Sequence, residues 1–263
     1  MGVYIKGRFS YDPDALAFIQ ASSIPQTTQK LAINQLVLDL KAYGLWSKMK
    51  AIYPMVGGSA FYHKWNLKDP RDLDAAFRLT FAGGWTHSST GAKPNGTNAI
   101  ADTFLISSGT LSQNSTHISY YSRTQSNGTE VEIGTASGNN PGDAGSLIEI
   151  RTSGISYYRI NSDGTYITYT DADSRAFYVA NRTASGVING WRNSTKVATG
   201  TTASTGLSTK SLILGAYNAG SIQFYSTKEC AFSSIGDGLT DAEAANFYTA
   251  VQAYNTTLGR NNP

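Results

Sequence analysis

Cysteine, charge and long apolar runs are all scarce in this sequence. A single cysteine, Cys230, among 263 residues excludes an internal disulfide framework. Charged residues make up 15% of the chain, against about 25% in a typical soluble domain. The formal net charge is +3 and the basic residues are dispersed, which argues against a nucleic-acid-binding function. No apolar run approaches the roughly 18 residues of a membrane-spanning helix, so we expect no membrane insertion.

The amino terminus lacks the apolar core of a signal peptide. It begins Met1-Gly2 but has Lys6 where a myristoylation motif requires serine or threonine. We therefore expect synthesis in the cytosol. Cys230 precedes the apolar residues Ala231 and Phe232 and has no histidine nearby in sequence, which predicts a buried strand thiol and not a nucleophile.

Serine, threonine, asparagine and glycine take the place of the missing charges. From about residue 50, short runs rich in Val, Ile, Thr, Tyr and Phe alternate with turn residues at intervals of about ten residues. The clearest runs are 117–122, 130–133, 147–150, 155–160, 165–169 and 176–180. Asn127-Gly128 and Asp163-Gly164 separate such runs and predict hairpin turns. The pattern predicts an antiparallel β-sandwich or jelly roll and excludes a parallel α/β sheet.

Helical patterns occupy both ends of the chain. Asp12-Pro13 predicts a helix start, and a second helix capped by Thr27 or Thr28 would extend to Gly44. This helical hairpin either folds against its own β domain or docks on a larger assembly. Near the carboxyl end, Thr240 and Glu243 form a capping box before a short amphipathic helix. We therefore divide the chain into an N-terminal arm and hairpin for attachment, residues 1–52, and a β domain, residues 53–263.

Three segments carry a resemblance to a known fold. Residues 187–190 (VING) are similar to a strand and turn of laminin-G-like domains, and residues 212–216 (LILGA) to a later strand. Residues 230–243 resemble the closing strand and helix start of the same group. Their order is similar to that of the concanavalin A-like lectin/glucanase jelly roll. This resemblance implies a mostly β fold, an antiparallel sandwich with the helical hairpin before it and the short helix after it.

A second resemblance covers the region between the hairpin and the first strands. Residues 44–54, 63–68, 81–88 and 94–98 resemble phage-encoded structural proteins. The resemblance implies a virion component of a tailed bacteriophage, made in the host bacterial cytoplasm, in a fibre, the tail or a head decoration. Its jelly roll would face outward, and its partners would be other virion proteins and further copies of itself. The alternative is a carbohydrate-binding adhesin that contacts a host surface glycan.

Catalytic residues are not evident in the sequence. The glucanase branch of the resembling group carries three acidic residues on one strand, whereas here Glu130 and Glu132 are followed by Gly134 and Thr135. We expect this pair to form the exposed polar face of an edge strand, and we predict that the protein is not an enzyme.

Metal and cofactor sites are not evident either. His63, His87 and His117 lie far apart without metal-ligand spacing. Asp171-Ala172-Asp173 and residues 139–143 offer loop oxygens for calcium without matching a calcium-binding loop, so we predict no cofactor. Trp65, Trp85 and Trp191 lie near turns, but no glycan-binding residue is assigned.

Overall fold

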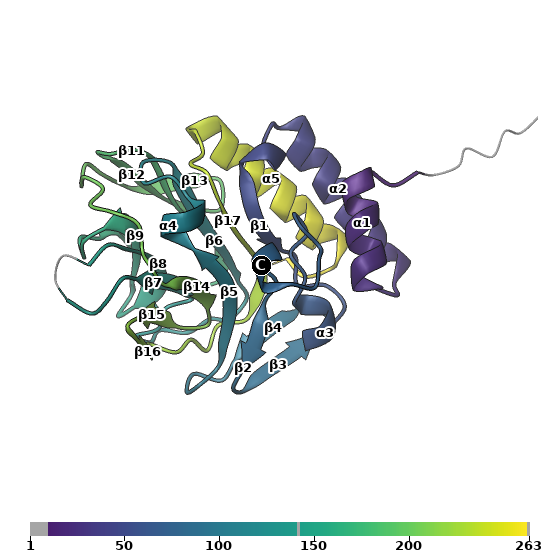
Figure 1. Cartoon of the computed structure of the whole chain (residues 1–263), viewed down its shortest axis with the longest axis horizontal. Coiled ribbons are helices and arrows are strands. Elements are labelled where there is room, and N and C mark those ends of the chain that lie inside the picture. The colour runs from purple at the N-terminus through teal and green to yellow at the C-terminus, as the bar shows by residue number, and fades with distance from the viewer. Residues whose placement is uncertain (1–9, 141–142, 262–263) are drawn as a thin grey trace, which may run out of the picture.

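The computed structural model describes residues 10–140 and 143–261. Three helices and two sheets form three layers (Figure 1). The helices of the outer layer are α1 (Pro13–Ser22), α2 (Thr27–Ala42) and α5 (Asp241–Thr257), and the short helices are α3 (Ala60–His63), α4 (Ser107–Thr110) and two 3₁₀ turns, Trp46–Lys48 and Asp74–Ala76. Among the described residues, no helix is long and apolar enough to cross a membrane.

The eight-stranded sheet lies in the middle layer, beneath the helices. Its order is β13 (Thr195–Gly200), β12 (Val187–Arg192), β11 (Ala176–Ala184), β6 (Thr116–Ser122), β17 (Cys230–Gly236), β4 (Gly91–Pro94) and β3 (Trp85–Ser88), with β1 (Met49–Tyr53) also paired to β17.

The nine-stranded sheet forms the other face of the sandwich. Its order is β10 (Ile167–Thr170), β9 (Ile155–Ser162), β8 (Gly145–Thr152), β7 (Ile133–Ala136), β14 (Ser211–Leu214), β5 (Ile100–Ile106) and β2 (Thr80–Ala82), with β15 (Tyr217–Ala219) beside β7 and β16 (Ser221–Gln223) paired to β15. All strand pairings are antiparallel except the short β15–β7 contact, so the predicted antiparallel β-sandwich with helices at both ends is confirmed.

Alternating side chains on the middle sheet explain the layering. Tyr120 and Tyr178 belong to the core between the two sheets, whereas the adjacent Tyr121 and Phe177 belong to the core beneath the helices. The middle sheet is thus apolar on both faces. Because Phe18 of α1 and Leu36 of α2 belong to the core beneath the helices, together with Phe177 of the sheet, the helical hairpin packs against its own β domain.

The helix starts follow the predicted residues with one exception. The Asp12 carboxylate accepts a hydrogen bond from the Asp14 N–H at 3.0 Å, with Pro13 in the first turn. At α5 both bonds of the Thr240–Glu243 capping box are present. The prediction that Thr27 or Thr28 caps α2 is wrong, because the cap position is Gln26 and both threonines lie inside the first turn.

One predicted hairpin is also wrong. Asp163-Gly164 lies between the paired strands β9 and β10, as expected. Asn127-Gly128 instead lies in a connection between β6 of the middle sheet and β7 of the outer sheet, which do not pair. A short turn signal marks a reversal of the chain but does not determine which strands then pair.

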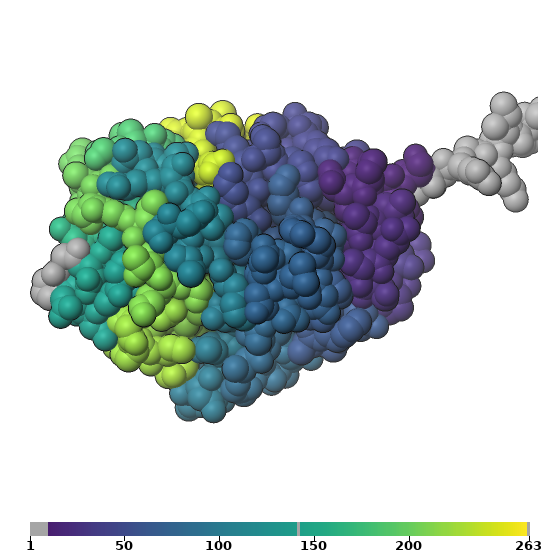
Figure 2. Space-filling view, viewed as in Figure 1, coloured from purple at the N-terminus to yellow at the C-terminus, as the bar shows by residue number. Residues whose placement is uncertain are grey.

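The surface of the molecule shows the same arrangement of helices and strands. Figure 2 shows the side chains of the N-terminal helices in purple at one end of the molecule and the teal and green strands of the sandwich at the other. The strands β9, β15 and β16 lie at this second end, away from α1 and α2 (Figure 1).

Candidate functional site

A pocket of about 440 Å³ lies beside the outer sheet, at the end of the molecule opposite α1 and α2. The loop between β7 and β8 contributes Asn139 and Asp143, and β9 contributes Arg159. The β9–β10 turn contributes Tyr166. Tyr217 of β15, Gln223 of β16 and Phe224 also line the pocket. Residues far apart in sequence therefore meet here.

Arg159 is the most buried charged residue that lines this pocket. Its neighbour Tyr158 enters the core between the sheets, so alternation along β9 directs Arg159 to the outer face. The Arg159 side chain is nevertheless only 4% exposed. A Cβ on Gly145 would lie 2.0 Å from Arg159 Nη2, so the glycine on β8 leaves the space that the guanidinium occupies.

Two tyrosines hold the guanidinium in place. Its carbon lies 5.6 Å from the ring centroid of Tyr166 and 5.7 Å from that of Tyr217. Nη2 donates to the Tyr217 hydroxyl, while Nε is buried without a hydrogen-bond partner. Burial raises the pKa of Tyr217 although Arg159 opposes the shift, so the phenol stays neutral and accepts the bond.

Tyr166 offers an exposed aromatic surface. Its side chain is 40% exposed, and its ring meets Tyr157 edge to face at 5.8 Å between centroids. This contact fixes the ring beside the pocket and leaves part of it open to a ligand.

Hydrogen bonds between loops fix the polar rim. Gln223 Nε2 donates to Asn139 Oδ1 at 3.0 Å, and Asn139 Nδ2 donates to Ser221 Oγ at 3.2 Å. The Asp143 carboxylate accepts from the Asn140 N–H at 2.7 Å. The pocket thus combines an exposed aromatic ring, a fixed cation and side-chain amides and carboxylates, which suits a ligand with an apolar face and several hydroxyl groups.

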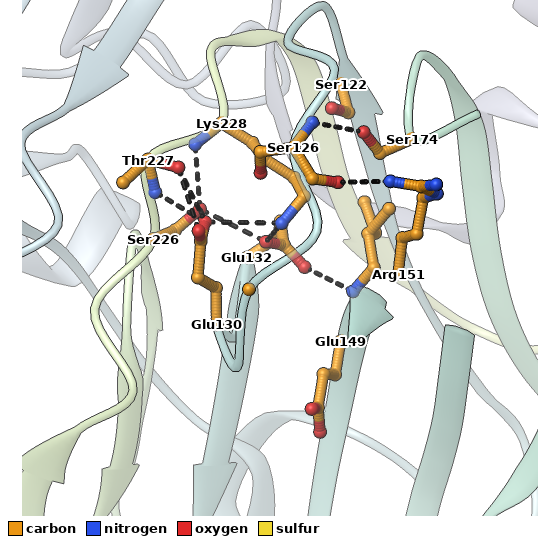
Figure 3. A network of polar contacts seen from close by, with 12 residues as sticks. Ser122, Ser126, Glu130, Glu132, Glu149, Arg151, Ser174, Ser226, Thr227 and Lys228 are labelled. Atoms are coloured by element: carbon orange, nitrogen blue, oxygen red, sulfur yellow. Dashed lines mark hydrogen bonds and ion pairs between the residues drawn. The ribbon is translucent and has the colours of Figure 1, made fainter. Parts of the chain in front are cut away.

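The predicted acidic pair lies elsewhere and is not exposed. Glu130 and Glu132 precede β7, and their exposed fractions are 8% and 0%. Lys228 Nζ lies 3.2 Å from Glu130 Oε2 and 3.1 Å from Glu132 Oε1, as Figure 3 shows. The prediction of an exposed edge-strand face is therefore wrong, because both carboxylates are buried around a lysine from a distant part of the chain.

The two carboxylates titrate differently. Burial raises the pKa of Glu132 to about 7, although Lys228 opposes the shift and the Ile150 N–H donates to Glu132 at 2.6 Å. Burial acts in the same sense on Glu130, but Lys228 and the Thr227 N–H outweigh it and lower the pKa of Glu130. The group joins residues 226–228 to the segment before β7.

The two loops considered for calcium have other contacts. The Asp171 carboxylate accepts from the Tyr178 hydroxyl at 2.7 Å and pairs with Arg192 at 3.2 Å. Asp173 pairs with Arg175 at 2.8 Å. In the other loop, Pro141 and Gly142 lie outside the described residues. No cluster of three or more His, Cys, Asp or Glu side chains suited to a metal occurs in residues 10–140 and 143–261.

Two of the histidines meet although they lie far apart in sequence. His63 Nδ1 and His87 Nδ1 are 2.9 Å apart, and burial lowers the pKa of His63 to about 3. The pair joins α3 to β3.

The tryptophans and the cysteine mainly make contacts within the fold. Trp65 and Trp191 are buried, and Trp85 donates its indole N–H to the Ile100 carbonyl at 3.0 Å. Cys230 is buried on β17, as predicted.

The sequence did not indicate a site at Arg159, Tyr166 or Tyr217. Arg159 and Tyr166 belong to runs that predict strands, and Tyr217 follows the segment 212–216. Residues 139–143 also reach the pocket, but the sequence indicated them only as a calcium loop. The one sequence signal for this site was the basic residue in the alternating run 155–160. A charged side chain on a sandwich strand has to point away from the core between the two sheets.

No family model and no curated protein matches this sequence. Several solved structures share its fold. A Trypanosoma rangeli sialidase mutant displaying trans-sialidase activity matches with a TM-score of 0.57 and 8% identity, over 84% of this chain and 39% of the sialidase. Domain 4 of AbnA, a GH43 extracellular arabinanase from Geobacillus stearothermophilus solved in complex with arabinotriose, matches with a TM-score of 0.50 and 14% identity, over 76% of this chain and 98% of that domain.

The NanB sialidase of Streptococcus pneumoniae, as its K499G mutant, matches with a TM-score of 0.45 and 16% identity, over 62% of this chain and 27% of the sialidase. The chain therefore spans less than half the length of these sialidases. At these identities the likeness establishes the fold alone: the chain shares a β-sandwich with domains of sialidases and of an arabinanase.

Proposed function

We propose that this protein binds carbohydrate without cleaving it, and that the binding site is the pocket formed by Arg159, Tyr166 and Tyr217. The observation that carries the proposal is the combination of the 40% exposed Tyr166 ring with the polar groups around it. The C–H face of a sugar packs on an aromatic ring, while its hydroxyls exchange hydrogen bonds with amides, carboxylates and guanidinium groups.

The fold comparison supports this proposal. The arabinanase domain, which the alignment covers almost completely, was solved in complex with arabinotriose. A β-sandwich of this kind thus serves as a scaffold for a bound oligosaccharide in another protein.

We propose binding without hydrolysis because of the position of the acidic pair, Glu130 and Glu132. Glycoside hydrolysis ordinarily needs two carboxyl groups on either side of a bound sugar. Glu130 and Glu132 are buried and share Lys228, so this pair cannot approach a glycosidic bond. To the two carboxylates that line the pocket, Asp143 and Asp163, the proposal assigns contacts with sugar hydroxyls and no catalytic role.

Binding to an immobilised panel of oligosaccharides tests the proposal. Wild-type protein should bind a subset saturably, and Tyr166→Ala should weaken that binding about tenfold through the lost ring contact. Tyr43→Ala is the matched control, because Tyr43 is 37% exposed at the end of α2, on the helical layer. Equal losses in both variants, or no binding to any glycan, would contradict the proposal.

Attachment to a bacteriophage particle remains a prediction from the sequence. What favours it is the position of α1 and α2 at the end of the molecule away from the pocket, so that attachment there leaves the pocket free (Figure 1). Peptide counting by mass spectrometry on purified particles tests it, and absence of the chain from the particles would contradict it.

A further inference from the structure

We propose that the ligand of this pocket is a saccharide that carries a carboxylate, and that Arg159 recognises this group. The inference rests on the proposed function and adds the chemical class of the sugar. It starts from the unusual environment of Arg159.

The buried cations of the molecule differ in what they contact. Four lysine or arginine side chains are buried among the described residues: Arg159, Arg182, Lys228 and Arg260. Lys228 pairs with two carboxylates. Arg182 donates to the carbonyls of residues 160, 184, 185 and 202, and Arg260 to those of residues 54, 55 and 231. Each of these three cations therefore has several acceptors within the protein, although Arg182 Nη2 is buried without one.

Arg159 has much less compensation. The one hydrogen bond of its guanidinium among the described residues goes to a neutral phenol, and no carboxylate lies within ion-pair distance. A guanidinium has five N–H donors, and here Nε is buried without an acceptor. Burying a cation with so few acceptors costs free energy unless a partner supplies the missing hydrogen bonds. Arg159 lines the pocket, so a ligand there is in a position to accept from the guanidinium donors that the protein leaves without partners and that are not buried.

A carboxylate fits this site better than a hydroxyl. The guanidinium is planar and forms two parallel hydrogen bonds with a carboxylate, whereas a hydroxyl accepts only one. Tyr166 and Tyr217 hold the plane of the guanidinium in advance, so little side-chain entropy is lost on binding. The sugar ring that bears the carboxylate would then pack against the exposed Tyr166.

Two aspartates that line the pocket would repel an anionic ligand, but they lie closer to solvent than Arg159. Asp143 is partly exposed and its carboxylate accepts the Asn140 N–H, and Asp163 is exposed in the β9–β10 turn. Their charges are screened by water, whereas the buried Arg159 charge is not. They would accept sugar hydroxyls at the rim and disfavour polyanions, which limits the ligand to one carboxylate near Arg159.

A second polar recess lacks the decisive feature. It has a volume of about 270 Å³ and is lined by Arg175 and Arg192. Both arginines are already ion-paired, with Asp173 and Asp171. The uncompensated cation therefore distinguishes the Arg159 pocket.

Calorimetric titration with matched pairs of sugars tests the inference. The probes are trisaccharides that end in glucuronate, galacturonate or N-acetylneuraminate, each compared with its carboxyl-reduced counterpart, in which –CH₂OH replaces the carboxylate. Wild-type protein should bind at least one acidic probe about 10- to 100-fold more tightly than its reduced form. Raising the salt concentration should reduce this preference only slightly, because salt screens a buried charge pair much less than an exposed one.

Two variants and a control locate the effect. Arg159→Gln should remove the preference for the acidic probe, and Arg159→Lys should keep only a small part of it because lysine lacks the planar pair of donors. Arg71→Gln removes the same charge from an exposed loop arginine and should leave the preference unchanged. Thermal unfolding shows whether each variant folds, and the comparison of paired probes on wild-type protein needs no variant.

The outcomes separate this inference from the proposed function. Equal affinity for acidic and reduced probes would overturn the carboxylate inference and leave carbohydrate binding in place. A preference that persists in folded Arg159→Gln would also overturn it, because another group would then recognise the anion. Binding to none of these probes, nor to any neutral glycan, would overturn the proposed function itself.

Discussion

Buried charge dominates the chemistry of this molecule at the scale of single residues. Lys228 is 0% exposed and lies between Glu130 and Glu132, which come from the segment before β7 (Figure 3). The lysine partly compensates both carboxylates, so its removal leaves uncompensated charge in a buried region. Such a cluster stabilises one arrangement of the chain more by the cost of breaking it than by the strength of its ion pairs.

Replacement of Lys228 by methionine tests this arrangement. We expect Lys228→Met to lower the free energy of unfolding by about 3–5 kcal/mol, because two carboxylates then lose their cation. Urea unfolding at neutral pH provides the measurement. Lys93→Met, at an exposed position of β4, should change the same quantity by no more than about 0.5 kcal/mol.

A second substitution separates charge from packing. In Lys228→Met, the additional change Glu132→Gln should recover part of the loss, because only one carboxylate then remains. No recovery would mean that the lysine stabilises the fold through its packing and not through its charge.

His117 makes stability depend on pH. It is buried between Asp237, Ser234 and Phe247, and burial lowers its pKa from 6.5 to about 4, with Lys48 acting in the same sense and Asp237 and Glu243 opposing. Below pH 6.5 the unfolded chain binds a proton that the folded chain does not. The stabilising contribution is therefore complete above pH 6.5 and is lost as the pH falls to about 4.

Other groups also make the unfolding free energy depend on pH: His63 changes it in the same direction as His117, and Glu132 in the opposite one. The comparison of the wild type with His117→Gln isolates the contribution of His117. Between pH 6.5 and 4, the unfolding free energy of the wild type should fall relative to that of the variant by about 1.4 kcal/mol per pH unit. Urea unfolding at several pH values measures the difference. A difference that is constant with pH would show that His117 is already protonated in the folded protein.

At the scale of elements, the ends of the helices determine how the helical layer is placed. The Lys48 ammonium lies 2.6 Å from the Glu243 carboxylate, which also accepts the Thr240 N–H in the capping box. The chain before β1 is thus joined to the start of α5. Phe247 of the same helix packs edge to face on Phe177 of the middle sheet at 5.2 Å. The cap fixes the helix end, and the aromatic contact fixes the face that it turns to the sheet.

Removal of the cap should have a moderate effect. We expect Thr240→Ala to lower the unfolding free energy by about 1 kcal/mol, because the Glu243 N–H loses its acceptor. Thr249→Ala in the middle of α5 is the control and should be close to neutral, since its hydroxyl only bonds back to the Ala245 carbonyl. Equal effects of the two substitutions, measured by urea unfolding, would argue against a capping role.

The elements themselves could largely be predicted from sequence, because each depends on local patterns. Alternation in runs such as 155–160 and the signals at Asp12 and Thr240 are local in this sense. The pairing of strands is not local, which is why Asn127-Gly128 was misinterpreted as a hairpin. Glu130 and Glu132 were misinterpreted for the same reason, since Lys228 lies almost a hundred positions away in the sequence.

At the scale of the whole molecule, the layers separate two surfaces. The helices cover one face of the middle sheet, and the outer sheet carries the pocket at the opposite end of the molecule (Figure 1). The pocket could not be predicted from sequence, because its lining comes from the β7–β8 loop, β9 and the strands β15 and β16, which meet only in the folded sandwich. The tryptophans near turns, to which no glycan-binding role was assigned, are largely structural: Trp65 and Trp191 are buried in the core beneath the helices.

The most direct test of the central claim is a chemical-shift titration of isotope-labelled protein with the oligosaccharide that binds best. Binding in the pocket predicts that the amide resonances that shift belong to residues 138–140, 159–166 and 217–224, with those of α1 and α2 unchanged. Shifts centred instead on the recess beside Arg175 and Arg192, on the surface around Trp85, or on the helical layer would contradict the assignment of this pocket as the carbohydrate site.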